Sequence, residues 1–137
     1  MINIDNKVVV RFKDGKMVKG RTNDFFPNRD CFHVTEEEDT KNVIEVSISH
    51  LKAVFFVKNF NGMKDHSSHE DFTKESFAKI PGVKLKVTFF DGEVIYGVST
   101  GYSPDRPGFF ILPVDKDSNN NRIFVVKEST TKVERLP

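Results

Sequence analysis

Two arginines in matching places are the residues of this chain best suited to binding a ligand. Arg29 and Arg106 each follow a proline by two residues, and each adjoins an aspartate, Asp30 or Asp105. The planar guanidinium group binds phosphate and carboxylate groups through two N–H donors at once, and binding residues are common on loops. Our hypothesis is therefore that the anionic group of a ligand binds at these two loops. The alternatives are an intramolecular pair between each arginine and its aspartate, or a turn that both units require, since Pro27 and Pro104 also repeat.

Two further segments contain residue types that bind metal ions. His66 and His69 lie among acidic residues, a donor set that zinc uses, but no cysteine or third histidine is close by in the sequence. The run Asp115–Asn121 places oxygen donors at alternate positions, as calcium loops do. Asn120 replaces the glycine of such a loop, and Val126 replaces its closing glutamate. We interpret both segments as polar loops and expect neither a metal ion nor a cofactor.

Cys31 and His50 are the residue types of a nucleophile and its base, but nothing in the sequence orients one toward the other. Cys31 begins an apolar stretch, where a buried free thiol is common. No oxyanion-binding motif accompanies the pair, so the requirements of a catalytic site are not met. We therefore expect that the protein is not an enzyme.

The composition limits the partners and the compartment. The formal net charge is +1, so no overall electrostatic field attracts nucleic acid. The single cysteine excludes an internal disulfide and suits a reducing compartment. The N-terminal residues lack the basic and long apolar parts of a signal peptide, and no apolar run is long enough to cross a membrane. We expect a cytoplasmic protein.

The two arginine loops lie at the same place in a repeated unit. The stretch Val8–Gly20 matches Leu85–Gly97, and the match continues without a gap to Phe32 and Phe109. Identities in phase with an apolar pattern indicate a duplication. The identical pairs are Val10 and Val87, Phe12 and Phe89, Asp14 and Asp91, Gly15 and Gly92, Gly20 and Gly97, Pro27 and Pro104, Arg29 and Arg106, and Phe32 and Phe109.

Each unit begins with a predicted β-hairpin. Apolar residues alternate with polar ones before an Asp-Gly pair, which is a strong hairpin signal. A three-residue loop would pair Val10 with Val18 and Val87 with Ile95, and this register keeps apolar residues on one face. We expect the glycine of each turn in the left-handed region, where glycine costs little.

Short apolar runs predict three further strands in each unit, with a single helical turn before the last strand. We therefore predict a mainly β protein of two tandem five-stranded antiparallel barrels, because closure removes most free strand edges. The expected domains are a first barrel at residues 1–57, a linker with a short helix at residues 58–82, and a second barrel at residues 83–137.

The order of residues in each unit resembles the first motif of Sm-like domains. That order is an apolar strand, an Asp-Gly turn, an apolar residue, a glycine, and an aromatic residue five positions later, Phe25 or Tyr102. The resemblance implies a small barrel. Sm-like RNA binders use an asparagine where this chain has Cys31 and Gly108, so the usual ligand is disfavoured. Residues 108–126 also resemble small uncharacterised bacterial proteins of this duplicated type.

The resemblance implies which residues share a site. In Sm-like barrels the loop that contains Arg29 or Arg106 lies beside the loop before the last strand, here Ser49-His50 and Ser129-Thr130. We expect these loops to bind a ligand together, with Phe25 and Tyr102 available to stack on bases. The expected site residues are Asn28, Arg29, Arg106, Ser49, His50, Ser129, Phe25 and Tyr102.

Two functions follow from these observations. The first is a non-enzymatic bacterial regulatory or adaptor module that binds a protein partner, or its own copies, through strand edges. It rests on the duplication, the near-neutral charge and the surplus of phenylalanine, since adjacent phenylalanines point to opposite faces of a strand. The alternative is binding of RNA or single-stranded nucleic acid by the two arginine loops. A nucleotide sensor of the PilZ type is disfavoured, because that family's arginine pair is missing.

Overall fold

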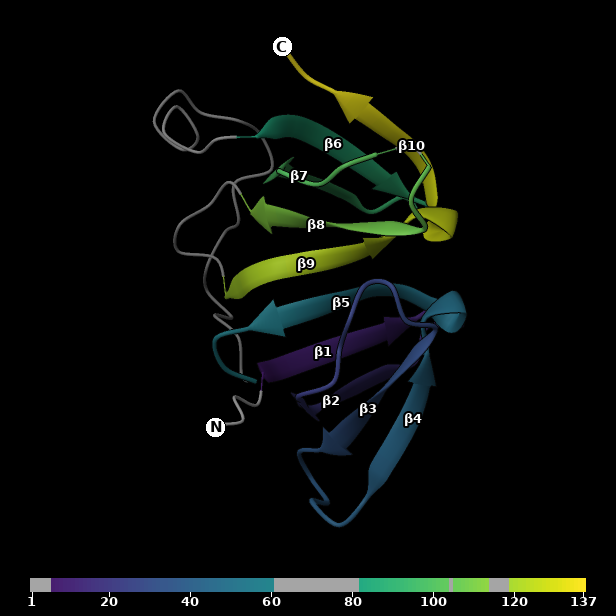
Figure 1. Cartoon of the computed structure of the whole chain (residues 1–137), viewed down its shortest axis with the longest axis vertical. Helices are drawn as coiled ribbons and strands as arrows, with labels where there is room; N and C mark the ends of the chain where they lie inside the picture. The colour runs from purple at the N-terminus through teal and green to yellow at the C-terminus, as the bar shows by residue number, and fades with distance from the viewer. Residues whose placement is uncertain (1–5, 61–81, 104, 114–118) are drawn as a thin grey trace.

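The computed structural model describes residues 6–60, 82–103, 105–113 and 119–137 (Figure 1). These residues form a mainly β protein, as the sequence predicts. The expected linker helix lies outside them. The elements in chain order are β1 (Asn6–Phe12), β2 (Met17–Thr22), β3 (Cys31–Glu36), β4 (Val43–Ser47), the 3₁₀ turn η1 (Ile48–His50), β5 (Leu51–Val57), β6 (Val83–Phe89), β7 (Val94–Ser99), β8 (Gly108–Pro113), β9 (Asn120–Val126), the 3₁₀ turn η2 (Lys127–Ser129) and β10 (Thr130–Arg135).

The hairpins β1–β2 and β6–β7 have the register that the alternation of apolar residues predicts. Val10 lies opposite Val18, and Val87 lies opposite Ile95. The turn glycines Gly15 and Gly92 have φ angles of 94° and 89°, a region that residues with a Cβ rarely adopt. The local prediction is therefore confirmed in both halves.

The prediction of two closed barrels is wrong. The strands form one open antiparallel sheet in the order β10-β6-β7-β8-β9-β5-β1-β2-β3-β4, and Figure 1 shows β9 and β5 side by side at its centre. The pairing of β5 with β9 merges the two halves. In the described part of the chain no pairing of β4 with β5, or of β9 with β10, closes either half. The sheet therefore ends in two outer strands, β4 and β10.

We call the pair β5–β9 the joint. Its side chains alternate between two hydrophobic cores, one for each half of the sheet. Phe124 and Val126 of β9 belong to the core of the first half, whereas Ala53 of β5 belongs to the core of the second. Each half therefore completes the core of the other.

Polar contacts also link the halves. Lys52 of β5 is almost fully buried, and its Nζ lies 2.8 Å from Asp91 Oδ2 and 2.5 Å from Glu93 Oε1, both in the β6–β7 hairpin. The hydroxyl of Ser129 donates a hydrogen bond of 2.6 Å to the carbonyl of Leu51. A charge this deeply buried is tolerated when it is paired, so these contacts fix how the halves are placed.

Candidate binding site

The β2–β3 and β7–β8 loops meet at the joint and form a groove of two adjoining hollows. The first hollow has a volume of about 500 Å³ and the second about 610 Å³. Both are within the usual size of ligand pockets. We call the two hollows the paired-loop groove. The residues that line both of them are Pro27, Asn28, Pro107 and Phe124.

The groove brings together four of the residues that the sequence nominates. Asn28, Arg29 and Ser49 line the first hollow, and Arg106 lines the second together with Asn28. The expected proximity of the arginine loop to the loop before the last strand is therefore found in the first half. His50 is exposed and does not line either hollow.

The remaining nominated residues have structural contacts. The ring of Phe25 packs edge-on against Phe32 at 4.9 Å and Phe124 at 5.1 Å, and Tyr102 packs edge-on against Phe109 at 4.9 Å. Both rings support the cores, so neither is a free platform for a base. Ser129 is buried and uses its hydroxyl in the joint.

The two arginines of the groove are exposed. Arg29 Cζ lies 5.0 Å from the centre of the Phe26 ring, and a Cβ at Gly101 would lie 3.7 Å from Arg106 Nη1. The alternative of an Arg–Asp pair is not found: between described residues, neither arginine has a carboxylate within ion-pair distance. Their guanidinium groups can therefore contact a bound partner.

The charge of the first hollow opposes a strongly anionic ligand. Asp30, Glu45 and Glu128 line it together with Arg29, whereas Arg106 is the one charged residue among the described residues that line the second. Three carboxylates beside one guanidinium repel phosphate groups. The groove as a whole suits a partner of mixed charge better than a nucleic-acid backbone.

The packing beside the groove explains why residue 108 is a glycine. A Cβ at this position would overlap the ring of Phe124, which lines both hollows. Cys31 holds the equivalent place in the first half, where its partner across the strands is Ser47 rather than Val126. The glycine is therefore required by packing at the joint.

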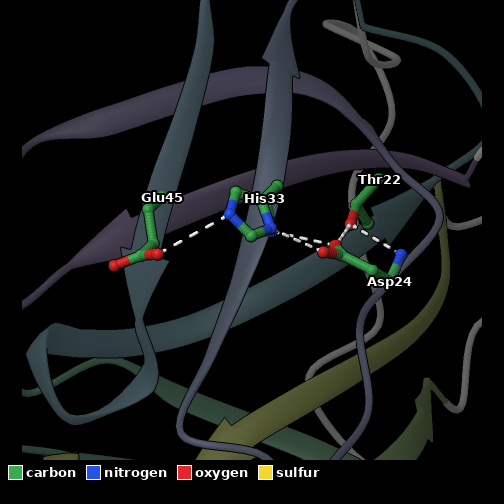
Figure 2. Close-up of polar contacts among 4 residues, drawn as sticks. All are labelled: Thr22, Asp24, His33 and Glu45. Carbon is green, nitrogen blue, oxygen red and sulfur yellow. Dashed lines mark hydrogen bonds and ion pairs between the residues drawn. The ribbon is translucent and has the colours of Figure 1, made fainter.

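A histidine lies between two carboxylates on the outer face of the first half, as Figure 2 shows. His33 on β3 has its Nδ1 2.7 Å from Asp24 Oδ2 and its Nε2 3.6 Å from Glu45 Oε2 on β4. The backbone N–H of His33 donates to Asp24 Oδ1 at 2.9 Å, and the hydroxyl of Thr22 donates to the same oxygen at 3.1 Å. This network keeps the face polar beside the outer strand.

The network shifts the pKa of both partners. The hydrogen bond with Asp24 raises the pKa of His33 above 6.5, and the charges of Asp24 and Glu45 act in the same direction. Partial burial acts to raise the pKa of Asp24, but hydrogen bonds from His33 and Thr22 outweigh it and leave that pKa below 3.8. The imidazolium form is therefore favoured between the carboxylates.

The outer strand β4 borders the groove, since Glu45 and Ser47 line the first hollow. We call residues 43–47 the β4 edge. Along this strand the backbone N–H and C=O groups point alternately toward β3 and away from it. Ile48 N–H donates to the carbonyl of Asp30, and the carbonyl of Asn42 accepts from Glu36 N–H, so the backbone groups of even-numbered residues face β3. The odd-numbered residues Val43, Glu45 and Ser47 therefore direct their N–H and C=O groups away from the sheet.

Sequence reasoning did not nominate the β4 edge or His33. Val43 is 56% exposed, and Glu45 is exposed as well. A signal for Glu45 does exist in the sequence, because the apolar run of residues 43–48 contains this glutamate, whereas the matching run of residues 123–126 contains no charged residue. No such signal exists for the pair of Asp24 and His33.

Other candidate chemistry finds no support in the described residues. In this part of the chain, no group of three or more His, Cys, Asp or Glu side chains is placed to hold a metal ion. His66, His69 and residues 115–118 of the calcium-like run lie outside it. The helical segments in the same part are too short for a membrane span.

The chain belongs to a protein family described as a family of unknown function (DUF6982), whose model matches residues 4–137. Comparison with curated proteins gave no match, and comparison with solved structures gave none either.

Proposed function

We propose that this member of a family without an assigned function is a non-enzymatic bacterial regulatory or adaptor module that binds an extended segment of a partner protein at the β4 edge. The proposal rests on one observation. In the second half, β9 holds the place that β4 holds in the first, and β9 accepts β5 as an antiparallel neighbour. At the edge that corresponds to β4, the sheet is therefore already extended by one antiparallel strand.

The β4 edge has the features that strand addition requires. It is the last strand of the sheet, and the backbone groups of Val43, Glu45 and Ser47 point outward. A bound segment would satisfy these groups through main-chain hydrogen bonds, while its side chains give specificity. Because Glu45 and Ser47 also line the first hollow, a longer segment would reach the paired-loop groove and Arg29.

The test uses short random peptides displayed on phage and selected on the full-length chain. We expect the recovered peptides to bind, as measured by fluorescence anisotropy, with little dependence on salt. Glu45→Pro should abolish binding, because proline lacks the outward N–H yet is tolerated on an edge strand. Glu45→Ala keeps the N–H and is the matched control. Failure to recover any peptide, or binding that survives Glu45→Pro, would overturn the proposal.

Nucleic-acid binding is the second candidate, because Arg29 and Arg106 line adjoining hollows. Its test is the anisotropy of labelled single-stranded RNA and DNA at low and moderate salt, with an Arg29→Ala, Arg106→Ala double variant. Binding to phosphates weakens steeply as salt rises. Salt-sensitive binding that the double variant loses would favour this candidate over the β4 edge.

We keep the Sm-like relationship and the cytoplasmic location as proposals. The relationship is supported by the five antiparallel strands, the tight first turn and the 3₁₀ turn before the last strand in each half. The single cysteine, Cys31, is free, which supports a reducing compartment.

A further inference from the structure

We infer that the β4 edge selects a foreign strand with the order small apolar, basic, aromatic, apolar, and that it rejects a second copy of this chain. The inference rests on the proposed function and specifies its partner. It is argued from the joint, which shows what a strand must present to this kind of edge, and from the residues that differ between β4 and β9.

The two halves correspond residue by residue at their edges. In the pairs β3–β4 and β8–β9, Phe32 lies opposite Val46 and Phe109 opposite Val125. In the pairs β1–β5 and β6–β10, a break in register occurs at the same place. The equivalent positions are therefore Val43 and Arg122, Glu45 and Phe124, Ala53 and Lys132, and Phe55 and Glu134.

At the joint, β5 presents a small and then an aromatic residue to one face of β9. Ala53 lies opposite Val125, and Phe55 lies opposite Ile123. The residues of β4 at these two places are Val46 and Ile44, which face the core of the first half. A strand on the β4 edge therefore needs a small apolar residue opposite Val46 and an aromatic residue opposite Ile44.

The other face differs between the two edges. Val54 lies opposite Phe124 at the joint, but the β4 edge has Glu45 there. A basic residue opposite Glu45 would form a cross-strand ion pair, and the carboxylate lies on the same face as His33. Phe56 lies opposite Arg122 at the joint, with the guanidinium carbon 4.4 Å from the ring centre. The β4 edge has Val43 at the position of Arg122, so the residue opposite Val43 should be apolar.

The chain's own outer strand does not fit this order. At the equivalent positions β10 has Lys132, Val133, Glu134 and Arg135. The charges of Lys132 and Glu134 would fall opposite Val46 and Ile44, toward the core of the neighbour. Val133 would fall opposite Glu45 and offer it no basic partner across the strands. Charged residues on edge strands prevent such pairing between copies, and a buried unpaired charge is costly.

The experiment measures three labelled peptides against the full-length chain by fluorescence anisotropy. The first has the sequence of residues 51–58 with Val54→Lys, the second is the same segment with Val54→Glu, and the third is residues 130–137. We expect the Val54→Lys peptide to bind about fivefold more tightly than the Val54→Glu peptide, from the size of cross-strand charge pairs. The peptide of residues 130–137 should not bind.

Two variants of the chain complete the test. Glu45→Lys should reverse the preference, so that the Val54→Glu peptide binds more tightly. Glu45→Pro should abolish binding of both, while circular dichroism shows that the variant is folded. Equal binding of the two peptides, lost in Glu45→Pro, would overturn the inferred order and leave the proposed function standing.

Each remaining outcome tests either the inferred order, the proposed function or the rejection of a second copy. If neither peptide binds but phage-selected peptides do, the inferred order is overturned alone. If no peptide of any origin binds, the proposed function falls with it. Light scattering of the wild-type chain at rising concentration should give the mass of a monomer. A larger mass that Glu45→Pro reduces to the monomer would overturn the rejection of a second copy.

Discussion

Glu45 and Phe124 occupy equivalent positions in the two halves of the sheet, opposite His33 on β3 and opposite Phe110 on β8. Phe124 is buried, and its ring lies 5.1 Å from Phe25 and 5.2 Å from Phe110. Glu45 is exposed, and its carboxylate lies 3.6 Å from the imidazole of His33. The edge that joins the two halves therefore has a buried aromatic ring at the place where the solvent-facing edge has a carboxylate.

Phe124→Ala should destabilise the chain strongly, because the ring fills the core of the first half from a strand of the second. We expect the free energy of unfolding to fall by about 3–5 kcal/mol, measured by denaturant titration. Phe26→Ala is the control, since Phe26 is 46% exposed, and it should change stability by less than about 0.5 kcal/mol. Similar losses in the two variants would show that the joint is not a structural centre.

The stability of the chain should fall more when Lys52 loses its two carboxylate partners than when the charge of Lys52 itself is removed. Asp91→Asn with Glu93→Gln leaves a buried ammonium unpaired and should cost about 2–4 kcal/mol of stability. Lys52→Met removes the buried charge and leaves half-exposed carboxylates, so its cost should be within about 1 kcal/mol. The control Glu128→Gln breaks the exposed pair with Lys13 and should cost less than about 0.5 kcal/mol. An equal cost for all three changes would contradict this account.

Stability should also depend on the charge of His33. Its pKa is raised in the folded chain above the ordinary value of 6.5, chiefly by the hydrogen bond with Asp24. The stabilising effect is therefore fully present below pH 6.5 and is lost as the pH rises through the folded pKa. An NMR titration should find a raised pKa in the wild type, a large fall toward 6.5 in Asp24→Asn, and a smaller fall in Glu45→Gln. No fall in Asp24→Asn would show that the network of Figure 2 is absent in solution.

The outer edges should become self-complementary when they receive the residues of the joint. We predict that Glu45→Phe, Lys132→Ala and Glu134→Phe together convert the chain into head-to-tail assemblies, because heterologous interfaces generate rings or filaments. The equivalent residues at the joint are Phe124, Ala53 and Phe55. Glu45→Phe alone should stay monomeric, since β10 would keep its charges. A folded, monomeric triple variant in light scattering would refute the role assigned to these three positions.

The sequence predicts the local structure well because the signals for it are local. The Asp-Gly pair and the alternation around Val10 and Val18 determine the hairpin register, and the structure has that register in both halves. The merged sheet could not be predicted in this way. It depends on β5 meeting β9, strands far apart in the chain, and the apolar character of Ala53 and Phe124 is equally compatible with closed barrels.

The candidate site was predictable mainly where the sequence repeats. Arg29 and Arg106 recur in the two units, so the sequence nominates them, and the structure places both in the paired-loop groove. His33 does not recur, because Phe110 holds its place in the second half. The β4 edge could not be predicted either, because it depends on which strands pair. Its backbone groups are available only because no strand of the described chain pairs with the outer side of β4.

Amide hydrogen exchange of the full-length chain, followed by NMR with and without the Val54→Lys peptide of residues 51–58, tests the central claim most directly. The account predicts that bound peptide slows exchange at the outward amides of Val43, Glu45 and Ser47 and leaves the amides of β10 unchanged. Slower exchange confined to β10, or to the loop residues around Arg29 and Arg106 with no change on β4, would contradict it.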